Sequence, residues 1–221
     1  MTNASEQTQN NADRIRRARS WCDRGMQIQN RDEETFLFLW IAFNAAYGKA
    51  GSVDRSEAKN FTEFVNLVVL KKRESRTSVF VQAIESFLFS DGNYPAQIKS
   101  LVENRYVFQP FWDARQDEEG DDAAWQDEFR SHKRQIKKDW ENRETAKVLG
   151  NLLWRLYTLR NQLLHGNMTY GFSWGDQQIH DGALIMRALV PEIVEVLDVD
   201  IESSPDTTFW GQVNYPRHEV G

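Results

Sequence analysis

Apolar residues recur at helical spacing along almost the whole chain. They return every three or four positions, which is the period of an amphipathic helix and not the two-residue period of a strand. The pattern predicts helices over residues 13–29, 33–47, 56–73, 77–89, 95–103, 123–140, 144–165 and 177–199. The chain contains no β-rich segment and no internal repeat. The sequence therefore predicts an all-α fold, a helical bundle with short additional helices and irregular loops.

Two segments depart from the usual amphipathic pattern. Residues 33–47 are apolar nearly all round, which is typical of a central, buried helix, and Gly48 is the expected end of that helix. Residues 105–115 are rich in aromatic side chains but are interrupted by Pro110, which favours an irregular or short helical piece. The acidic stretch that follows, 115–122, is expected to be an exposed loop.

The ends of the chain are polar, and this sets the predicted domain boundaries. Residues 1–11 lack the apolar stretch of a signal peptide and are predicted to form a disordered N-terminal tail. Residues 12–201 are predicted to form a single helical domain, because a chain of 221 residues can bury one substantial core. Residues 202–221 then form a C-terminal tail, which Phe209 and Trp210 could anchor.

The composition is that of an ordinary soluble globular protein. Hydrophobic residues make up 40% of the chain and charged residues 27%. No apolar run approaches the roughly 18 residues of a membrane span. The single cysteine, Cys22, excludes an internal disulfide and a cysteine-based zinc cluster, and it fits a reducing compartment. We therefore expect a cytoplasmic protein without membrane contact. The net charge of −6 argues against a protein that coats nucleic acid, but a small RNA site needs only a few phosphate contacts.

The candidate chemistry lies at the end of the helix predicted over residues 144–165. At about 100° per residue, Arg160 falls in the middle of an apolar stripe, where a guanidinium is costly unless it is paired or faces an anion. The stripe consists of Leu149, Leu152, Leu153, Leu156 and Leu163. Asn161 and His165 are four residues apart and share the adjoining face. Gly166 stands where a left-handed residue commonly ends a helix, which places His165 in the last turn.

These three side chains suit the cleavage of a phosphodiester. A histidine such as His165 can move the proton of a ribose 2′-hydroxyl or of the leaving oxygen. The guanidinium of Arg160 can hold the phosphate, and the amide of Asn161 can orient the imidazole or the scissile group. Because the 2′-hydroxyl would be the nucleophile, no metal ion or other cofactor is expected, and the substrate would have to be RNA.

The pattern R-N-x-x-x-H at 160–165 resembles the signature of the HEPN superfamily, and LRNQLLHG is similar to the motif helix of its ApeA-like group. The apolar helix FLFLWIAFNAAYG at 36–48, with Trp40 and Asn44, resembles that group's second landmark. The resemblance covers roughly residues 30–190. It implies a HEPN-like helical bundle that forms a homodimer with a composite active site, in which the motifs of two protomers face one cleft.

The same resemblance implies a metal-independent RNA endonuclease in a toxin or anti-phage defence setting, with an antitoxin or defence-system partner. One departure concerns regulation. A tyrosine usually follows two residues after the histidine in HEPN toxins paired with a nucleotidyltransferase antitoxin, but here Asn167 occupies that position and the nearest tyrosine is Tyr170.

Several alternatives remain open at this level. Arg160 could pair with a buried acid while His165 only caps its helix, leaving a non-catalytic module that binds a nucleotide or a partner protein. Asn44 must find hydrogen-bond partners inside its apolar helix, and the site formed by Arg160 is one candidate. Tyr170 could stack on a base beside the cleavage point, as could Asn167 and Trp174, although a simple ordered loop also accounts for them. Of the remaining histidines, His132 is expected to face solvent and His218, in the tail, to be inert. His180, near the start of the last helix, could approach the site, although a surface role also accounts for it.

Overall fold

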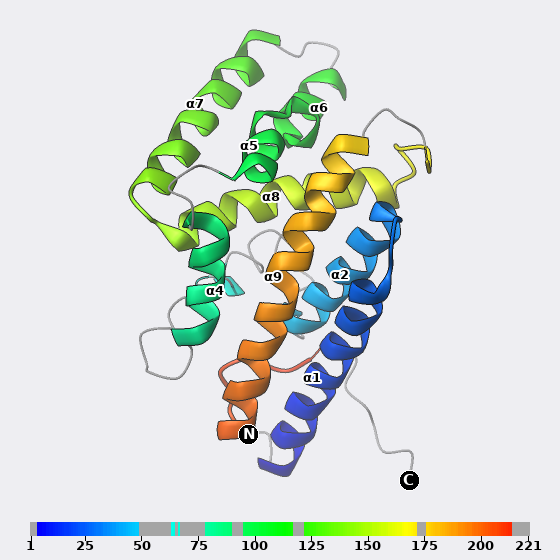
Figure 1. Ribbon diagram of the computed structural model, residues 1–221, viewed down its shortest axis with the longest axis vertical. Coiled ribbons are helices and arrows are strands. Elements are labelled where there is room, and N and C mark those ends of the chain that lie inside the picture. Colours follow the sequence, from blue (N-terminus) through cyan, green and yellow to red (C-terminus); the bar gives the residue numbers. More distant parts are fainter. Residues whose placement is uncertain are drawn as a thin grey trace. The chain divides into compact units, whose positions relative to one another are not determined.

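The computed structural model describes residues 4–48, 63–64, 66, 78–89, 95–116, 122–171 and 176–213. Within these ranges every regular element is a helix and no residue lies in a strand, so the predicted all-α fold is confirmed (Figure 1). In chain order the elements are α1 (Ala4–Gln27), α2 (Asp32–Tyr47), α4 (Ser78–Phe89), α5 (Ala96–Glu103), the 3-10 helix η3 (Arg105–Val107), α6 (Gln109–Gln116), α7 (Asp122–Glu141), α8 (Thr145–Leu164) and α9 (Asp176–Ser203).

The chain divides into two compact units, and the predicted single domain over residues 12–201 stays a prediction. The first unit comprises Met1–Ile84 and Met186–Gly221, and the second comprises Glu85–Ile185. The division falls inside α4 and inside α9, so the apolar periodicity of these helices gave no sign of it. None of the helices in the described ranges is both long enough and apolar enough to cross a membrane.

The core of the first unit is built on the packing of α1 against α2. As predicted, α2 is apolar and largely buried, with Phe36, Leu39 and Phe43 fully inside. It ends at Gly48, whose backbone N–H donates to the carbonyl of Asn44 at 2.8 Å. The helix predicted over 56–73 lies outside the described residues, apart from three helical positions at 63, 64 and 66.

The prediction of a disordered tail over residues 1–11 was wrong, because α1 already begins at Ala4. The amide of Asn11 is completely buried and donates to the carbonyls of Pro205 and Thr207, each at 2.8 Å. Asn10 donates to the carbonyl of Gly211 at 3.1 Å and accepts from the N–H at position 213. Hydropathy does not detect such bonds between side-chain amides and the backbone, so this polar helical turn resembled a tail.

The C-terminal segment is part of the first unit's core up to residue 213. Trp210 is only 1% exposed, and its indole N–H donates to Asp200 Oδ2 at 2.8 Å. The predicted anchoring by this side chain is therefore confirmed. The buried guanidinium of Arg14 donates to the carbonyls of Trp210 and Gly211 and also to those of Ala46 and Gly48, at 2.6–3.1 Å. Arg14 thus joins α1, the end of α2 and the C-terminal segment.

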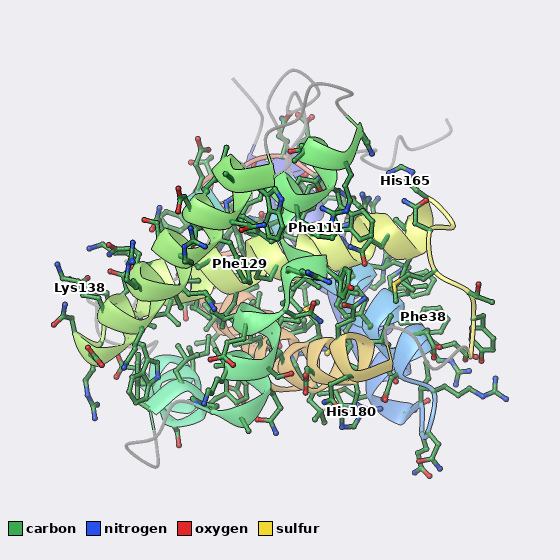
Figure 2. All side chains as sticks on the ribbon, turned by 90° about the horizontal axis from the view of Figure 1, so that it is seen from above. Phe38, Phe111, Phe129, Lys138, His165 and His180 are labelled. Atoms are coloured by element: carbon green, nitrogen blue, oxygen red, sulfur yellow. The ribbon has the colours of Figure 1, made fainter. Side chains whose placement is uncertain are left out.

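In the second unit, α8 packs against α5, η3 and α7. A cluster of aromatic residues, centred on buried Phe108, Phe111 and Trp125, ties η3 and α6 to α7. Figure 2 shows Phe111 and Phe129 among these helices, whereas His165 stands at the end of α8. The predicted short helical piece over 105–115 is confirmed as η3 and α6, and Pro110 lies in the first turn of α6, where its missing N–H is tolerated.

Candidate functional site

The last turn of α8 ends in a Schellman motif, which fixes the backbone of His165. The N–H of Asn167 donates to the carbonyl of Gln162 at 2.9 Å, and the N–H of Gly166 donates to that of Leu163 at 3.2 Å. Gly166 has a φ of +68°, the left-handed conformation that glycine adopts most readily. The predicted helix end is therefore confirmed, and the exposed side chain of His165 leaves the helix just before the chain turns away.

Arg160 lies at the margin of the buried face and not at its centre. Leu149, Leu152, Leu153 and Leu156 are buried as predicted, but towards its end the buried face continues through Leu159 and Gln162 instead of Arg160. The half-buried guanidinium of Arg160 donates from Nη1 to Asn161 Oδ1 at 2.9 Å and lies 5.8 Å from the ring centroid of Tyr157. The flank that carries Gln162 is held instead by hydrogen bonds that hydropathy does not register, to the backbone carbonyl of Tyr106 in η3 and from the side chain of Gln178.

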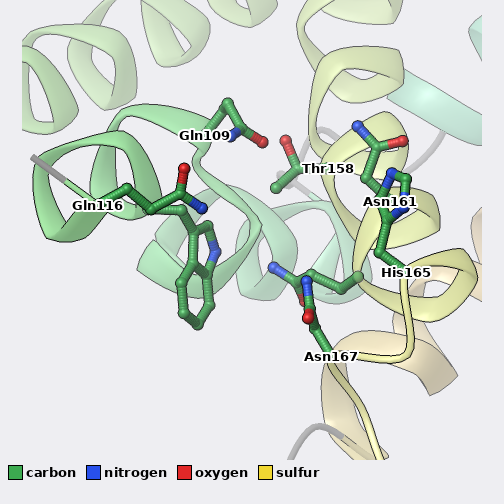
Figure 3. Close-up of a pocket in the computed structure, with 8 residues that line it drawn as sticks. Gln109, Gln116, Thr158, Asn161, His165 and Asn167 are labelled. Carbon is green, nitrogen blue, oxygen red and sulfur yellow. The ribbon is translucent and has the colours of Figure 1, made fainter.

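Asn161 and His165 line one pocket of about 220 Å³ in the second unit, as their helical spacing predicts. Thr158 and Gln162 belong to the same wall, which is one side of α8. The opposite wall is α6, which contributes Gln109, Trp112 and Gln116, and Asn167 enters from the loop after α8. Figure 3 shows Gln109 and Gln116 across the pocket from Thr158, Asn161 and His165.

A network of buried amides holds the two walls together. Gln162 donates from Nε2 to the carbonyl of Tyr106 and accepts from Gln178 Nε2 at 3.4 Å. Gln178 accepts in turn from Asn104 Nδ2 at 2.9 Å, and Asn104 Oδ1 accepts from the N–H of Tyr106 at 2.9 Å. The indole N–H of Trp112 donates to the same Tyr106 carbonyl at 2.8 Å. These bonds fix the distance between η3, α6 and the last turns of α8.

Most of the residues that line the pocket are polar but uncharged. Five of the eight residues carry a primary amide, and His165 is the one titratable side chain among them. Sequence reasoning identified Asn161, His165 and Asn167 and missed the α6 wall. The available signal was the dense aromatic stretch around Pro110, which marks a helix start and a packed cluster, but it does not say which side of α6 faces α8.

The other predicted candidates lie elsewhere. Tyr170 is 66% exposed and is not among the residues that line the pocket. Asn44 belongs to the first unit, where its Oδ1 is buried without a hydrogen-bond partner in the part of the chain that the structure describes, so its pairing with the Arg160 site stays a prediction. His132 is exposed, as expected, and His180 is exposed too. Trp174 and His218 lie outside the described residues.

Among the described residues, no three His, Cys, Asp or Glu side chains gather closely enough to hold a metal ion. Comparison with known proteins adds no identification, since no protein family, curated protein or solved structure matches the chain.

Proposed function

We propose that this protein is a metal-independent RNA endonuclease whose active site is the pocket between α6 and the end of α8. The observation that supports this most is the shared location of Asn161 and His165 in one pocket, with Arg160 hydrogen-bonded to Asn161. A proton-transfer group, an amide and a guanidinium thus lie together where a phosphodiester could enter. These are the residue types that cleavage through the ribose 2′-hydroxyl requires.

In the proposed reaction the 2′-oxygen attacks the adjacent phosphorus while the bond from phosphorus to the 5′-oxygen breaks. Neutral His165 accepts the proton of the 2′-hydroxyl, and the leaving 5′-oxygen takes a proton from water or from a second imidazole. The products are a 2′,3′-cyclic phosphate and a free 5′-hydroxyl. The exposed position of His165 leaves its imidazole open to solvent for the exchange of that proton.

Asn161 and Arg160 have complementary roles in this proposal. Because Asn161 Oδ1 accepts from Arg160, the amide is held with its Nδ2 available to donate elsewhere. In Figure 3 this nitrogen is turned to the side of Thr158. The amide can then orient a phosphate oxygen, while the neighbouring guanidinium stabilises the charge that builds on the phosphate.

We further propose, from the resemblance to ApeA-like HEPN domains, that two copies form a homodimer with a composite active site. Trp154 and Leu164 on α8 are 45% and 54% exposed, and apolar side chains at this exposure on the motif helix suit contact with a second copy. In such a dimer the second His165 would supply the proton for the leaving oxygen. A cytoplasmic toxin or anti-phage defence role with an antitoxin or defence-system partner belongs to the same proposal.

The uncharged lining of the pocket favours one alternative, a non-catalytic module that binds a nucleotide or a partner protein. A pocket in which only His165 can be cationic is suited to a neutral polar group as well as to a phosphate. The two hypotheses differ in whether RNA is cleaved, because a binding module holds its ligand without cutting it.

The test is to incubate total RNA in EDTA with the wild type, with His165→Ala, and with His180→Ala as an exposed histidine outside the pocket. We expect fragments that end in 2′,3′-cyclic phosphate from the wild type and from His180→Ala, and a rate at least about 100-fold lower for His165→Ala. The far-UV helix signal of all three proteins should be equal. Equal cleavage by His165→Ala and wild type would exclude the proposed mechanism.

A further inference from the structure

The α6 wall and the pocket amides other than Asn161 form a surface that the cleavage chemistry does not use. We propose that this surface is a subsite for one unpaired nucleobase, which stacks on Trp112 and is hydrogen-bonded by Gln116 and Asn167. Only the position of the base relative to the cleaved bond depends on the proposed function. The binding itself requires no cleavage.

The size of the pocket limits the ligand. Its volume of about 220 Å³ is below the roughly 300–1,000 Å³ of sites for drug-sized molecules. A single base is therefore a better match than a longer oligonucleotide segment, the rest of which would lie outside.

Trp112 has the properties of a stacking platform. Its indole N–H is fixed by the bond to the Tyr106 carbonyl, and its ring packs edge-on against Phe111 with 5.0 Å between centroids. The side chain is half-buried and lines the pocket, so its orientation is set before a ligand arrives. Stacking on such a ring accepts any base, because every base has a π-face.

The amides around Trp112 differ in how their hydrogen-bonding groups are used. Gln162 is engaged on both its oxygen and its nitrogen within the network behind the pocket. Gln109 donates to Asp113 at 2.8 Å, which leaves its carbonyl oxygen as an acceptor. The side chains of Gln116 and Asn167 make no hydrogen bond with any residue that the structure describes, and both line the pocket.

Side-chain amides without an internal partner are suited to form hydrogen bonds with the edge of a nucleobase. Each one offers a donor and an acceptor side by side, which is the arrangement that pairs with the neighbouring donor and acceptor of a base such as adenine. Their location beside His165 places the bound base on the nucleotide next to the scissile phosphate. The substrate is therefore RNA in a loop or single strand, because a paired base could not enter.

The experiment measures binding of the four nucleoside 3′-monophosphates to the full chain by calorimetry, with ribose 5-phosphate as the ligand that lacks a base. We expect at least one nucleotide to bind at least about tenfold more tightly than ribose 5-phosphate. Trp112→Ala should remove that advantage, and Trp112→Phe, which keeps a stacking ring, should retain most of it. Trp21→Ala is the matched control, since this tryptophan belongs to the first unit.

Because Trp112→Ala also loses a hydrogen bond and could unfold α6, Gln116→Ala and Asn167→Ala are measured alongside it. Each should weaken the preferred nucleotide about three- to tenfold while leaving ribose 5-phosphate unchanged. Asn151→Ala, on the same helix as the motif but outside the pocket, should have no effect.

If all four nucleotides bind no more tightly than ribose 5-phosphate, or if Gln116→Ala and Asn167→Ala both bind like wild type, the base subsite is wrong, whether or not RNA is cut. Base-dependent binding that these variants abolish would support the subsite even if no RNA were cleaved, in which case the nuclease proposal alone would fail.

Discussion

A group of buried polar side chains serves the backbone of the first unit, whereas the second unit also has polar side chains that line a pocket. In the first unit, Arg14, Asn10 and Asn11 are buried and their donors are directed at backbone carbonyls of the same unit. In the second unit, Gln116 and Asn167 line a pocket without internal hydrogen bonds to described residues, next to an exposed His165. Residue type therefore does not distinguish a structural polar side chain from a functional one. The two are distinguished by whether their hydrogen-bonding groups already have partners within the protein.

The largest expected effect comes from removing the polar centre of the first unit. Arg14→Ala takes the guanidinium away from four carbonyls, of which that of Gly211 keeps its bond from Asn10, and each buried group left unsatisfied costs about 1–3 kcal/mol. We expect the free energy of unfolding to fall by at least about 3 kcal/mol in a urea titration. Burial lowers the pKa of Arg14 to about 10, so the residue is still charged at neutral pH and the loss should appear there.

Arg24→Ala is the control, because Arg24 is an exposed arginine of the same helix, and its replacement should change the free energy of unfolding by only about 0.5 kcal/mol. A stability loss for Arg14→Ala no larger than that of Arg24→Ala would contradict the structural role of the buried guanidinium.

A second comparison lies within the pocket itself. Gln162→Ala removes both bonds of the buried amide and should lower the free energy of unfolding by about 1–3 kcal/mol. Gln116→Ala, at the exposed end of α6, should change it by less than about 0.5 kcal/mol and act only on ligand binding. Urea titrations of both variants give the answer. An equal loss of unfolding free energy in both variants would mean that Gln116 also has a structural role, contrary to the proposal.

Replacing each of two glycines in the α8 region by alanine should change the stability of the protein in opposite directions. Gly166→Ala places a side chain at φ +68° and should destabilise the protein by about 1 kcal/mol while displacing His165. Gly150→Ala lies inside α8, where an added Cβ meets no atom within 4 Å, and should stabilise by about 0.5–1 kcal/mol. Thermal unfolding of the two variants distinguishes these signs, and a higher melting temperature for Gly166→Ala would show that the helix end is not held as described.

The smallest expected effect concerns Cys22 in the first unit. Burial raises the pKa of its thiol to about 11 from the ordinary value of 9.0, with a further contribution from the charge of Asp23. Because the folded state holds this proton more tightly, stability should be unaffected below pH 9 and should decline slightly as the pH rises from 9 towards 11. Alkylation at pH 8 should be much slower in the native protein than in urea, and equal rates would show an accessible thiolate.

The sequence was sufficient for the helices whose apolar residues face a core. The positions of α2, α5, α7 and α8 follow directly from hydrophobic spacing and from Gly48 and Gly166 at helix ends. The sequence did not predict the elements that are held by side-chain amides instead of apolar contacts. The first turns of α1 are held by Asn10 and Asn11, and no hydropathy pattern reveals a carbonyl two hundred residues away.

The residues of the candidate site likewise fall into those that the sequence predicts and those that it does not. Asn161 and His165 share a pocket because helical spacing alone puts them on one face. The marginal position of Arg160 and the wall formed by Trp112 depend on how α6 and η3 pack on α8, through Gln162, Tyr106 and Gln178. Such long-range contacts cannot be obtained from the local order of residues in one sequence.

The most direct test of the central claim uses one RNA oligonucleotide that the wild type cuts at a mapped bond, in EDTA. The ribose on the 5′ side of that bond is replaced by 2′-deoxyribose, and single-turnover rates are measured for both oligonucleotides. The proposed mechanism predicts that cleavage at that bond disappears with the deoxy substrate, as it does for His165→Ala with the all-ribose substrate. Cleavage of the deoxy substrate at an undiminished rate would contradict attack by the 2′-hydroxyl and, with it, the mechanism assigned to the pocket.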